Sequence, residues 1–362
     1  NTDAIDNSAG VNTSDIEVNI KIALSIPERD QRLRSDQREK LLAEMTDEVA
    51  ELVLRNNYLQ TLALSLSERK GAAELAMARV QMRRLEEAGR LDRSVEFLPD
   101  DAALMLRESR GEGLTRPELA VLLAYAKLAL YDELLASPIP DEPYLAVEAT
   151  RYFPPQICKA FPDAVEHHRL KREIIATQLA NLVINRGGPT LVAQLGDETG
   201  AKGPSIARAY ALARDAFGLL DLNTEIDGLD AKIAGAAQLD LYEAVQNALI
   251  RRMMWFLRNV DVALPLDQQV RRFAAGVAEV RQALSRLASP DGLEQNRLAT
   301  GWTDAGVPAD LARRIAELPE LEAAPEGVLI AEASGQGVVD AVATLFGLAQ
   351  AFDVGRLKAG AA

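Results

Sequence analysis

The residues best suited to chemistry in this sequence lie close together in its first stretch: Asn7, Gly10, Val11 and Ser14. The small side chains around Gly10 are typical of a turn where the backbone approaches another molecule. The Asn7 amide offers both a donor and an acceptor, and the Ser14 hydroxyl can donate to a carboxylate. We therefore predict an irregular turn that presents these groups to a ligand.

Ser14 and Glu17 have the spacing of a capping box, which predicts a helix that begins at Asp15 with Ser14 as its N-cap. The free N–H groups and the positive dipole end of such a helix would point back toward the turn. That arrangement favours a carboxylate or amide ligand. The alternative is an ordinary capped turn with no ligand.

This stretch resembles a known family. Residues 7–14 read N-S-A-G-V-N-T-S and resemble the N-A-G-G-V-x-x-S segment of the glutamate dehydrogenase superfamily, with Ser8 and Ala9 as departures before Gly10. Residues 2–21 are more similar to the large bacterial NAD-specific glutamate dehydrogenases, which carry T-D-A-I-D-N-S-A-G-V and then S-D-x-E-V-N-I-K. The run TRPELAVLLAYAKLALYDELL at 115–135 resembles the helical region that follows in that family, and the similarity extends to about residue 260.

The resemblance implies a role for each residue of the motif. Asn7 would lie beside the nicotinamide of NAD, and Gly10 would let the backbone approach the substrate. Val11 would touch the aliphatic part of the amino acid, and Ser14 would donate to its side-chain carboxylate. The parent enzyme would oxidise L-glutamate to 2-oxoglutarate and ammonia.

The catalytic residues of that family are not recognisable in this chain. No G-x-G-x-x-G follows a predicted strand, so NAD would be bound mainly by an upstream domain. The family's catalytic lysines and aspartate also belong to that portion, and the first lysine after the motif, Lys21, lies on the following helix. Because the chain opens without Met on a motif and closes on K-A-G-A-A, we expect a truncated C-terminal fragment that is inactive alone.

The composition indicates a helical protein. Aromatic residues make up 5% of the 362 residues and hydrophobic residues 48%, with Ala and Leu dominant. That composition favours close helix packing over a β-sandwich. The net charge of −14 argues against binding to nucleic acid or an anionic membrane, since both are polyanions. No apolar run approaches the roughly 20 residues that a membrane span needs. The single cysteine, Cys158, cannot form an intrachain disulfide and agrees with a cytoplasmic location.

Hydrophobic periodicity predicts a mainly α fold, a bundle-like array of many helices. The resemblance implies that a short tail of a Rossmann-type α/β catalytic domain precedes this array. We expect residues 1–28 to end the catalytic domain, 29–260 to form a helical domain, and 261–362 to form a smaller, truncated helical region. The clearest helix start is the capping box at Thr115 and Glu118, with Pro117 in its first turn. The expected helices lie at about 15–25, 35–65, 68–88, 100–108, 115–135, 142–152, 155–166, 168–185, 204–222, 231–259, 266–288, 308–317 and 336–352.

Other chemically suggestive residues have plainer interpretations. His167 and His168 point about 100° apart on a helix and have no third ligand nearby, so we expect capping or solvated histidines and no metal site. Cys158 lacks a C-x-x-C partner and is expected to be a small packed side chain. Arg251 and Arg252 are expected at a solvated helix edge or a subunit contact.

Two functions remain open from the sequence. The first is a fragment of an NAD-dependent glutamate dehydrogenase, whose helical body packs on the catalytic core or forms the interfaces of a homo-oligomer. The second is a helical protein-interaction module without enzymatic function, in which residues 1–24 form only a capped turn.

Overall fold

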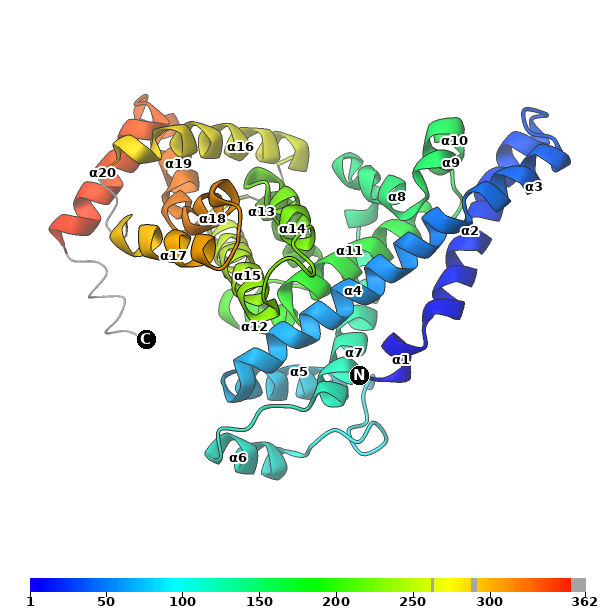
Figure 1. The fold of residues 1–362 in the computed structure, drawn as a ribbon, viewed down its shortest axis with the longest axis horizontal. Helices are drawn as coiled ribbons and strands as arrows, with labels where there is room; N and C mark the ends of the chain where they lie inside the picture. The colour runs from blue at the N-terminus through cyan, green and yellow to red at the C-terminus, as the bar shows by residue number, and fades with distance from the viewer. Residues whose placement is uncertain (262–263, 288–291, 353–362) are drawn as a thin grey trace. The chain divides into compact units, whose positions relative to one another are not determined.

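The computed structural model describes residues 1–261, 264–287 and 292–352, and every regular element in these ranges is a helix (Figure 1). The mainly α prediction is therefore confirmed. The tail of a Rossmann-type α/β domain predicted at 1–28 contains no strand, since these residues form α1 and most of α2. The predicted truncation at 358–362 lies outside the described residues.

The chain divides into two compact units, residues 1–208 and 209–362, and the boundary falls inside α13. The helices of the first unit are α1 (Asp3–Asp6), α2 (Ala9–Arg29), α3 (Ser35–Glu44), α4 (Thr46–Lys70), η1 (Gly71–Glu74), α5 (Leu75–Glu87), α6 (Asp101–Ser109), α7 (Arg116–Leu135), η2 (Ile139–Asp141), η3 (Pro143–Ala146), α8 (Val147–Tyr152), α9 (Pro155–Ala160), α10 (Pro162–Glu166), α11 (Lys171–Gly187), α12 (Leu191–Thr199) and the start of α13 (Gly203–Ala216).

The core of the first unit is built from the three long helices α4, α7 and α11, which pack against one another (Figure 1). The apolar face predicted for 115–135 is buried there and includes Leu122, Leu123 and Leu130. The predicted capping box is also confirmed. The Glu118 carboxylate accepts from the Thr115 backbone N–H at 2.7 Å, and Arg107 holds the same carboxylate from α6.

Several predicted helix boundaries were wrong. The helix expected at 35–65 is two helices that break at Met45, whose side chain is buried at the junction. The helix expected at 15–25 is longer at both ends, because α2 begins at Ala9 and continues through Pro27 to Arg29. The sequence interpretation also missed helices α1, α12, α17 and α19.

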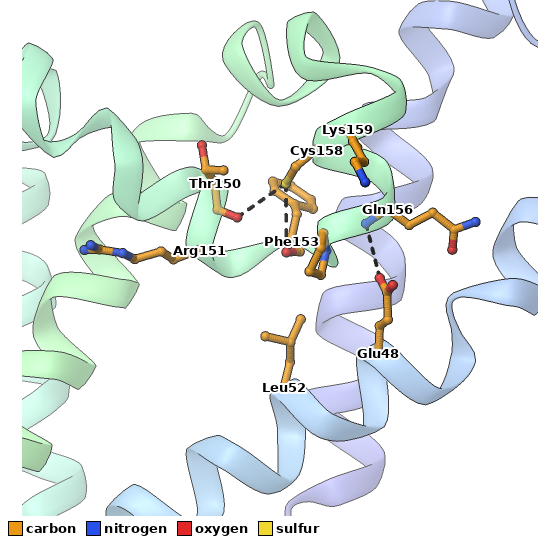
Figure 2. Close-up of a pocket in the computed structure, with 9 residues that line it drawn as sticks. Glu48, Leu52, Thr150, Arg151, Phe153, Gln156, Cys158 and Lys159 are labelled. Atoms are coloured by element: carbon orange, nitrogen blue, oxygen red, sulfur yellow. Dashed lines mark hydrogen bonds between the residues drawn. The ribbon is translucent and has the colours of Figure 1, made fainter. Parts of the chain in front are cut away.

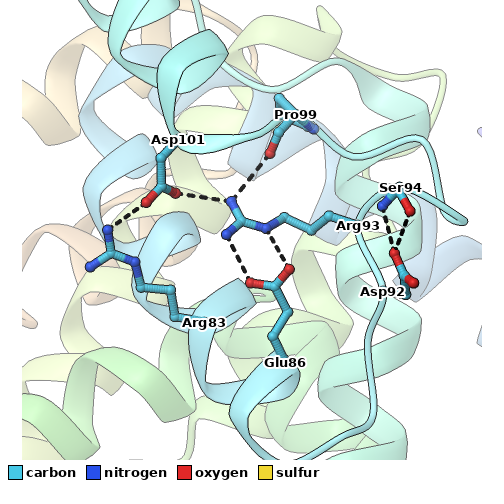
Figure 3. A network of polar contacts seen from close by, with 7 residues as sticks. All are labelled: Arg83, Glu86, Asp92, Arg93, Ser94, Pro99 and Asp101. Carbon is cyan, nitrogen blue, oxygen red and sulfur yellow. Dashed lines mark hydrogen bonds and ion pairs between the residues drawn. The ribbon is translucent and has the colours of Figure 1, made fainter.

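An arginine-centred network fixes the loop between α5 and α6 (Figure 3). Arg93 donates two hydrogen bonds to Glu86, at 2.9 and 2.8 Å, and one of 2.9 Å to Asp101. Arg83 pairs with the other oxygen of Asp101. The hydrogen bonds from these two guanidinium groups lower the pKa of Asp101 to about 2. The loop is thus tied to α5 and to the start of α6 by groups that stay charged at neutral pH.

The helices of the second unit pack around an aromatic core. Phe217, Phe256 and Phe273 meet edge to face, with ring centroids 5.0 to 6.5 Å apart. A Cβ on Gly276 or Gly327 would collide with a valine side chain, so these glycines permit close helix packing. The second unit contains the remainder of α13, α14 (Leu219–Asp227), α15 (Gly235–Asn259), α16 (Leu266–Ala283), η4 (Leu284–Arg286), α17 (Gly292–Asp304), α18 (Ala309–Ala316), η5 (Glu320–Ala323), α19 (Ala324–Ser334) and α20 (Val338–Ala351).

Arg252 is buried inside the second unit, so the prediction of a solvated edge or a subunit contact was wrong for this residue. Its guanidinium donates to Glu322 at 2.6 Å and to the Leu318 carbonyl, and it lies 4.9 Å from the centre of the Phe217 ring. Burial lowers the pKa of Arg252 to about 10. An arginine in this position joins α15 to the segment before α19 instead of facing a partner.

No single helix in the described residues is long and apolar enough to cross a bilayer, whereas one bent pair, Glu320–Ser334 with Val338–Ala351, has the length and composition for it.

Candidate functional site

The turn between α1 and α2 is where the structure places the start of the motif. Ser8 precedes α2, and its hydroxyl lies 3.1 Å from Asn57 Oδ1 on α4 and accepts a hydrogen bond from Asn12 at 3.0 Å. Ser8, one of the two departures from the N-A-G-G-V pattern, therefore anchors the turn to α4. Asn7 directly precedes Ser8. The side-chain amide of Asn7 is exposed and makes no hydrogen bond within the part of the chain that the structure describes.

The structure corrects the prediction for Ser14. The helix begins at Ala9, so Ser14 lies in its second turn and is neither an N-cap nor part of a capping box. Gly10 and Val11, predicted to be in a turn, are helical as well. Ser8, not Ser14, directly precedes the helix, and its side chain makes no capping hydrogen bond. The argument that the N-terminal field of this helix acts at the Ser14 hydroxyl therefore fails.

A single exposed face of α2 carries the predicted substrate-binding residues. Ser14 follows Gly10 by four residues and Val11 by three, a spacing that places each pair on one side of a helix. Val18 and Lys21 continue the same stripe. Val11 is 75% exposed and Val18 is 50% exposed. Among the described residues, nothing lies within 4 Å of where a Cβ on Gly10 would be.

The opposite face of α2 is buried against the helical body of the first unit. Ile16, Ile20, Ala23 and Leu24 are buried, and α2 packs on α4 and α10. This apolar face fixes the rotation of α2 about its own axis, because a different rotation would expose it.

A buried polar cluster that the sequence interpretation missed fixes α2 further. The Tyr152 hydroxyl on α8 donates to Asp15 at 2.9 Å and accepts from Asn19 at 2.8 Å. Burial, followed by the charge of Asp15, raises the pKa of Tyr152, so it remains a neutral donor. The signal available in the sequence was Asn19 itself, a polar residue three positions after Ile16 on an otherwise apolar stripe.

His168 belongs to the same cluster, so the prediction of a solvated or capping histidine holds only for His167. His167 ends α10, whereas His168 is 4% exposed. His168 Nδ1 accepts from the Leu170 N–H at 3.1 Å, which leaves Nε2 as the nitrogen that donates to the Asn19 carbonyl at 3.1 Å. Burial lowers the pKa of His168, so the ring is neutral near pH 7.

An open pocket of about 740 Å³ lies in the first unit between α4 and the α8–α9 segment (Figure 2). Cys158 is half-buried at its wall, and its thiol lies 3.4 Å from the Thr150 carbonyl. Leu52 and Phe153 make the pocket largely apolar, with Glu48 at its edge. Burial raises the pKa of Cys158, which keeps it a thiol. Within the described ranges, no group of three or more His, Cys, Asp or Glu side chains is placed to hold a metal ion.

Two family models match this chain. Residues 111–362 match the family described as glutamate dehydrogenase, C-terminal, and residues 1–67 match that described as bacterial NAD-glutamate dehydrogenase, catalytic domain. The second match ends inside α4, so helices from both families pack together in the first unit. The four predicted site residues all lie in the part that matches the catalytic family.

Individual relatives agree with these matches. The chain is 39% identical over 98% of its length to an NAD-specific glutamate dehydrogenase of Pseudomonas aeruginosa, and 40% identical over 90% to one of Halomonas elongata. A third, from Mycobacterium tuberculosis, is 34% identical over 87%. The chain spans 22%, 20% and 19% of these three relatives, about a fifth of each. On this evidence, the chain belongs to the bacterial NAD-specific glutamate dehydrogenase family, of which it covers the end of the catalytic domain and the C-terminal region.

Proposed function

We propose that this chain is the C-terminal part of an enzyme that oxidises L-glutamate to 2-oxoglutarate and ammonia with NAD. The observation that carries the proposal is the division of α2 into two faces. One face is buried in the helical body, and the other presents Gly10, Val11 and Ser14 on an exposed surface. An exposed valine stripe beside a glycine and a hydroxyl suits contact with a neighbouring catalytic portion and its substrate.

The residues of this surface have distinct roles in the proposed reaction. A hydride leaves Cα of glutamate for NAD, the amino nitrogen loses a proton, and water then hydrolyses the resulting imine to release ammonia. Ser14 donates a hydrogen bond to the side-chain carboxylate of glutamate, which orients Cα. Val11 packs against the methylene groups, and Gly10 leaves room for the substrate beside the helix.

Asn7 fits a role toward the cofactor. Its exposed amide, which has no partner among the described residues, offers both a donor and an acceptor to the carboxamide of NAD. The G-x-G-x-x-G fingerprint is absent from the sequence, so in this proposal an upstream domain holds the pyrophosphate.

The helical body then serves to hold α2 in position and to pack against the rest of the enzyme or against other subunits of a homo-oligomer. The tie from Tyr152 to Asp15 and Asn19 supports this role, because it fixes α2 next to Ser14. The alternative is a non-enzymatic interaction module, in which the exposed stripe of α2 binds only protein.

Steady-state kinetics of the full-length enzyme carrying Ser14→Ala distinguishes the two. We expect kcat/KM for glutamate to fall by roughly 10- to 150-fold, the loss of a hydrogen bond to a charged group, with the KM for NAD little changed. Ser25→Ala is the matched control, since Ser25 is an exposed serine of the same helix whose hydroxyl bonds the Ile22 carbonyl. Equal kinetics for wild type and Ser14→Ala would contradict the assignment.

A further inference from the structure

The loop between α5 and α6 presents an aromatic side chain to solvent in an unfavourable backbone conformation. Phe97 is 89% exposed, and its φ of +55° lies in the left-handed region. Aromatic residues adopt this conformation rarely, because their Cβ then crowds the backbone. The strained backbone and the exposed ring both cost free energy, and strain of this kind is typical of functional segments.

The residues on both sides of Phe97 are held in place, so the exposure of the ring follows from the structure of the loop. Glu96 accepts a 2.6 Å hydrogen bond from the Tyr125 hydroxyl on α7, and Leu98 is buried. The Leu98 N–H donates to the carbonyl of Arg93 at 2.9 Å, and the Arg93 guanidinium is the centre of the network that ties the loop to both helices (Figure 3). Turning Phe97 inward would break these contacts.

The same short segment carries three further exposed apolar side chains. Val95 in the loop and Met105 and Leu106 on α6 are each more than half exposed, whereas Leu104 is the buried residue of this helix. Large apolar side chains gathered in one short segment are typical of a surface that another part of a protein covers. We call Val95, Phe97, Met105 and Leu106 the 95–106 surface.

Asn1 is held close to α6 by the first turn of α7 (Figure 1). Arg107 on α6 donates to Glu118 in that turn at 2.6 and 2.9 Å. Arg116, in the same turn, donates to the Asn1 side chain at 2.9 Å. This chain spans about a fifth of its relatives, and residues 1–67 match their catalytic family. In the proposed enzyme, the rest of the catalytic domain therefore precedes Asn1 and enters this unit beside α6.

We propose that the 95–106 surface binds the part of the catalytic domain that precedes Asn1 in the full-length enzyme. This inference rests on the proposed function, which supplies a catalytic domain before Asn1. A chain that leaves Asn1 remains near α6 over its nearest residues, because each residue spans at most about 3.6 Å. The covalent link also gives this segment a high effective concentration at the surface, which a separate molecule lacks. The catalytic domain would then contact this unit at two elements, the exposed face of α2 and the 95–106 surface.

Photo-cross-linking of the full-length enzyme tests the contact. A benzophenone amino acid replaces Phe97, and the linked peptides are identified by mass spectrometry. We expect the peptide that contains position 97 to be linked to a peptide that precedes Asn1. The control carries the same probe in place of Lys40, an exposed residue of α3, which has no buried residue, and should give no such linked peptide.

Hydrogen exchange provides a second readout with natural residues. Phe97→Asn removes the ring and introduces a residue that tolerates a positive φ, so the loop keeps its conformation. In the full-length enzyme we expect exchange within residues 102–106 to become about tenfold faster, the effect of losing one aromatic residue from a contact. Gln31→Asn is the matched control, because Gln31 is exposed and has a φ of +59° outside the 95–106 surface. It should leave exchange within 102–106 unchanged.

The linked peptide distinguishes the possible occupants. A link from position 97 to a peptide within residues 1–362, of the same copy or of a second copy, would overturn the proposal. The absence of any linked peptide, or unchanged exchange in Phe97→Asn, would overturn it as well. In each of these cases, oxidation of glutamate by the same enzyme would leave the proposed function intact, and the kinetics of Ser14→Ala test that function separately.

Discussion

The hydroxyl of Tyr152 on α8 donates a 2.9 Å hydrogen bond to Asp15 on α2, the residue directly after Ser14. The same hydroxyl accepts from Asn19, so one tyrosine holds two successive turns of α2. The helical body is thereby connected to the face that carries the motif.

Tyr152→Phe removes both hydrogen bonds, one to the exposed Asp15 and one from the buried Asn19, whose amide still donates to the Asp15 carbonyl. We expect a loss of about 0.5–1.5 kcal/mol in the free energy of unfolding, the net contribution of a typical hydrogen bond. The KM for glutamate should rise in the full-length enzyme, since α2 is held less firmly. Denaturant unfolding and steady-state kinetics measure the two effects. Tyr131→Phe on α7 is the control, and an equal loss in both variants would contradict a specific role for Tyr152.

Lys127 on α7 makes stability depend on pH. Its ammonium group donates to Gln60 at 2.9 Å, and burial lowers its pKa to about 7. The unfolded chain binds this proton up to about pH 10.4, so it holds more protons than the folded chain between about pH 7 and 10.4. Stability from this group therefore rises with pH across that window and is lowest below it. Lys127→Met should stabilise the protein more at pH 6 than at pH 10, as urea unfolding at both values would measure; an equal gain at both contradicts it.

His168 should make the protein less stable in acid. Because its folded pKa is lowered, the unfolded chain takes up the proton first as the pH falls through about 6.5. Stability from this group is thus present above that pH and is lost below it. His168→Gln should flatten the dependence between pH 7 and 5, whereas His167→Gln at the exposed neighbour should leave it unchanged. Thermal unfolding at several pH values checks both.

The loop between α5 and α6 should depend on Arg93 more than on Arg90. Arg93 makes three hydrogen bonds to two carboxylates and is largely shielded, whereas Arg90 pairs with Asp132 at the surface. We expect Arg93→Ala to cost about 1–3 kcal/mol and Arg90→Ala below about 1 kcal/mol. Limited proteolysis within residues 88–100 should accelerate only in Arg93→Ala. Cleavage at the wild-type rate would show that the network does not hold the loop.

Local sequence signals predicted a helix start correctly where several of them agreed on the same position. Thr115, Pro117 and Glu118 mark a helix start by three independent preferences, and the structure has that start. Ser14 and Glu17 offered a single signal of the same kind, and it was wrong, because a helix already begun at Ala9 continues through it. Pro27 likewise did not end α2, because its buried side chain continues the apolar face of Ala23 and Leu24, and the helix ends two residues later at Arg29.

The buried polar residues could not be placed from the sequence. Asn19, Tyr152 and His168 are separated by more than 130 residues at the extremes and meet only because α2 lies against α8 and the segment after α10. Glu74 and Thr190 meet in the same way over 116 positions. The periodicity of one helix reports which face is buried, but it does not identify the polar group that will lie opposite.

The two-faced character of α2 constrains how its length can change. Each residue added to a helix turns everything beyond it by 100°. One residue inserted between Ser14 and Asn19 would therefore rotate the motif face by about 100° relative to the anchoring face. With Asn19 still held by Tyr152, the motif residues would no longer point to the same side. An insertion at 30–34, after the helix has ended, leaves that phase intact. The spacing between the motif and its anchors is thus fixed to the residue, and the loop that follows does not set it.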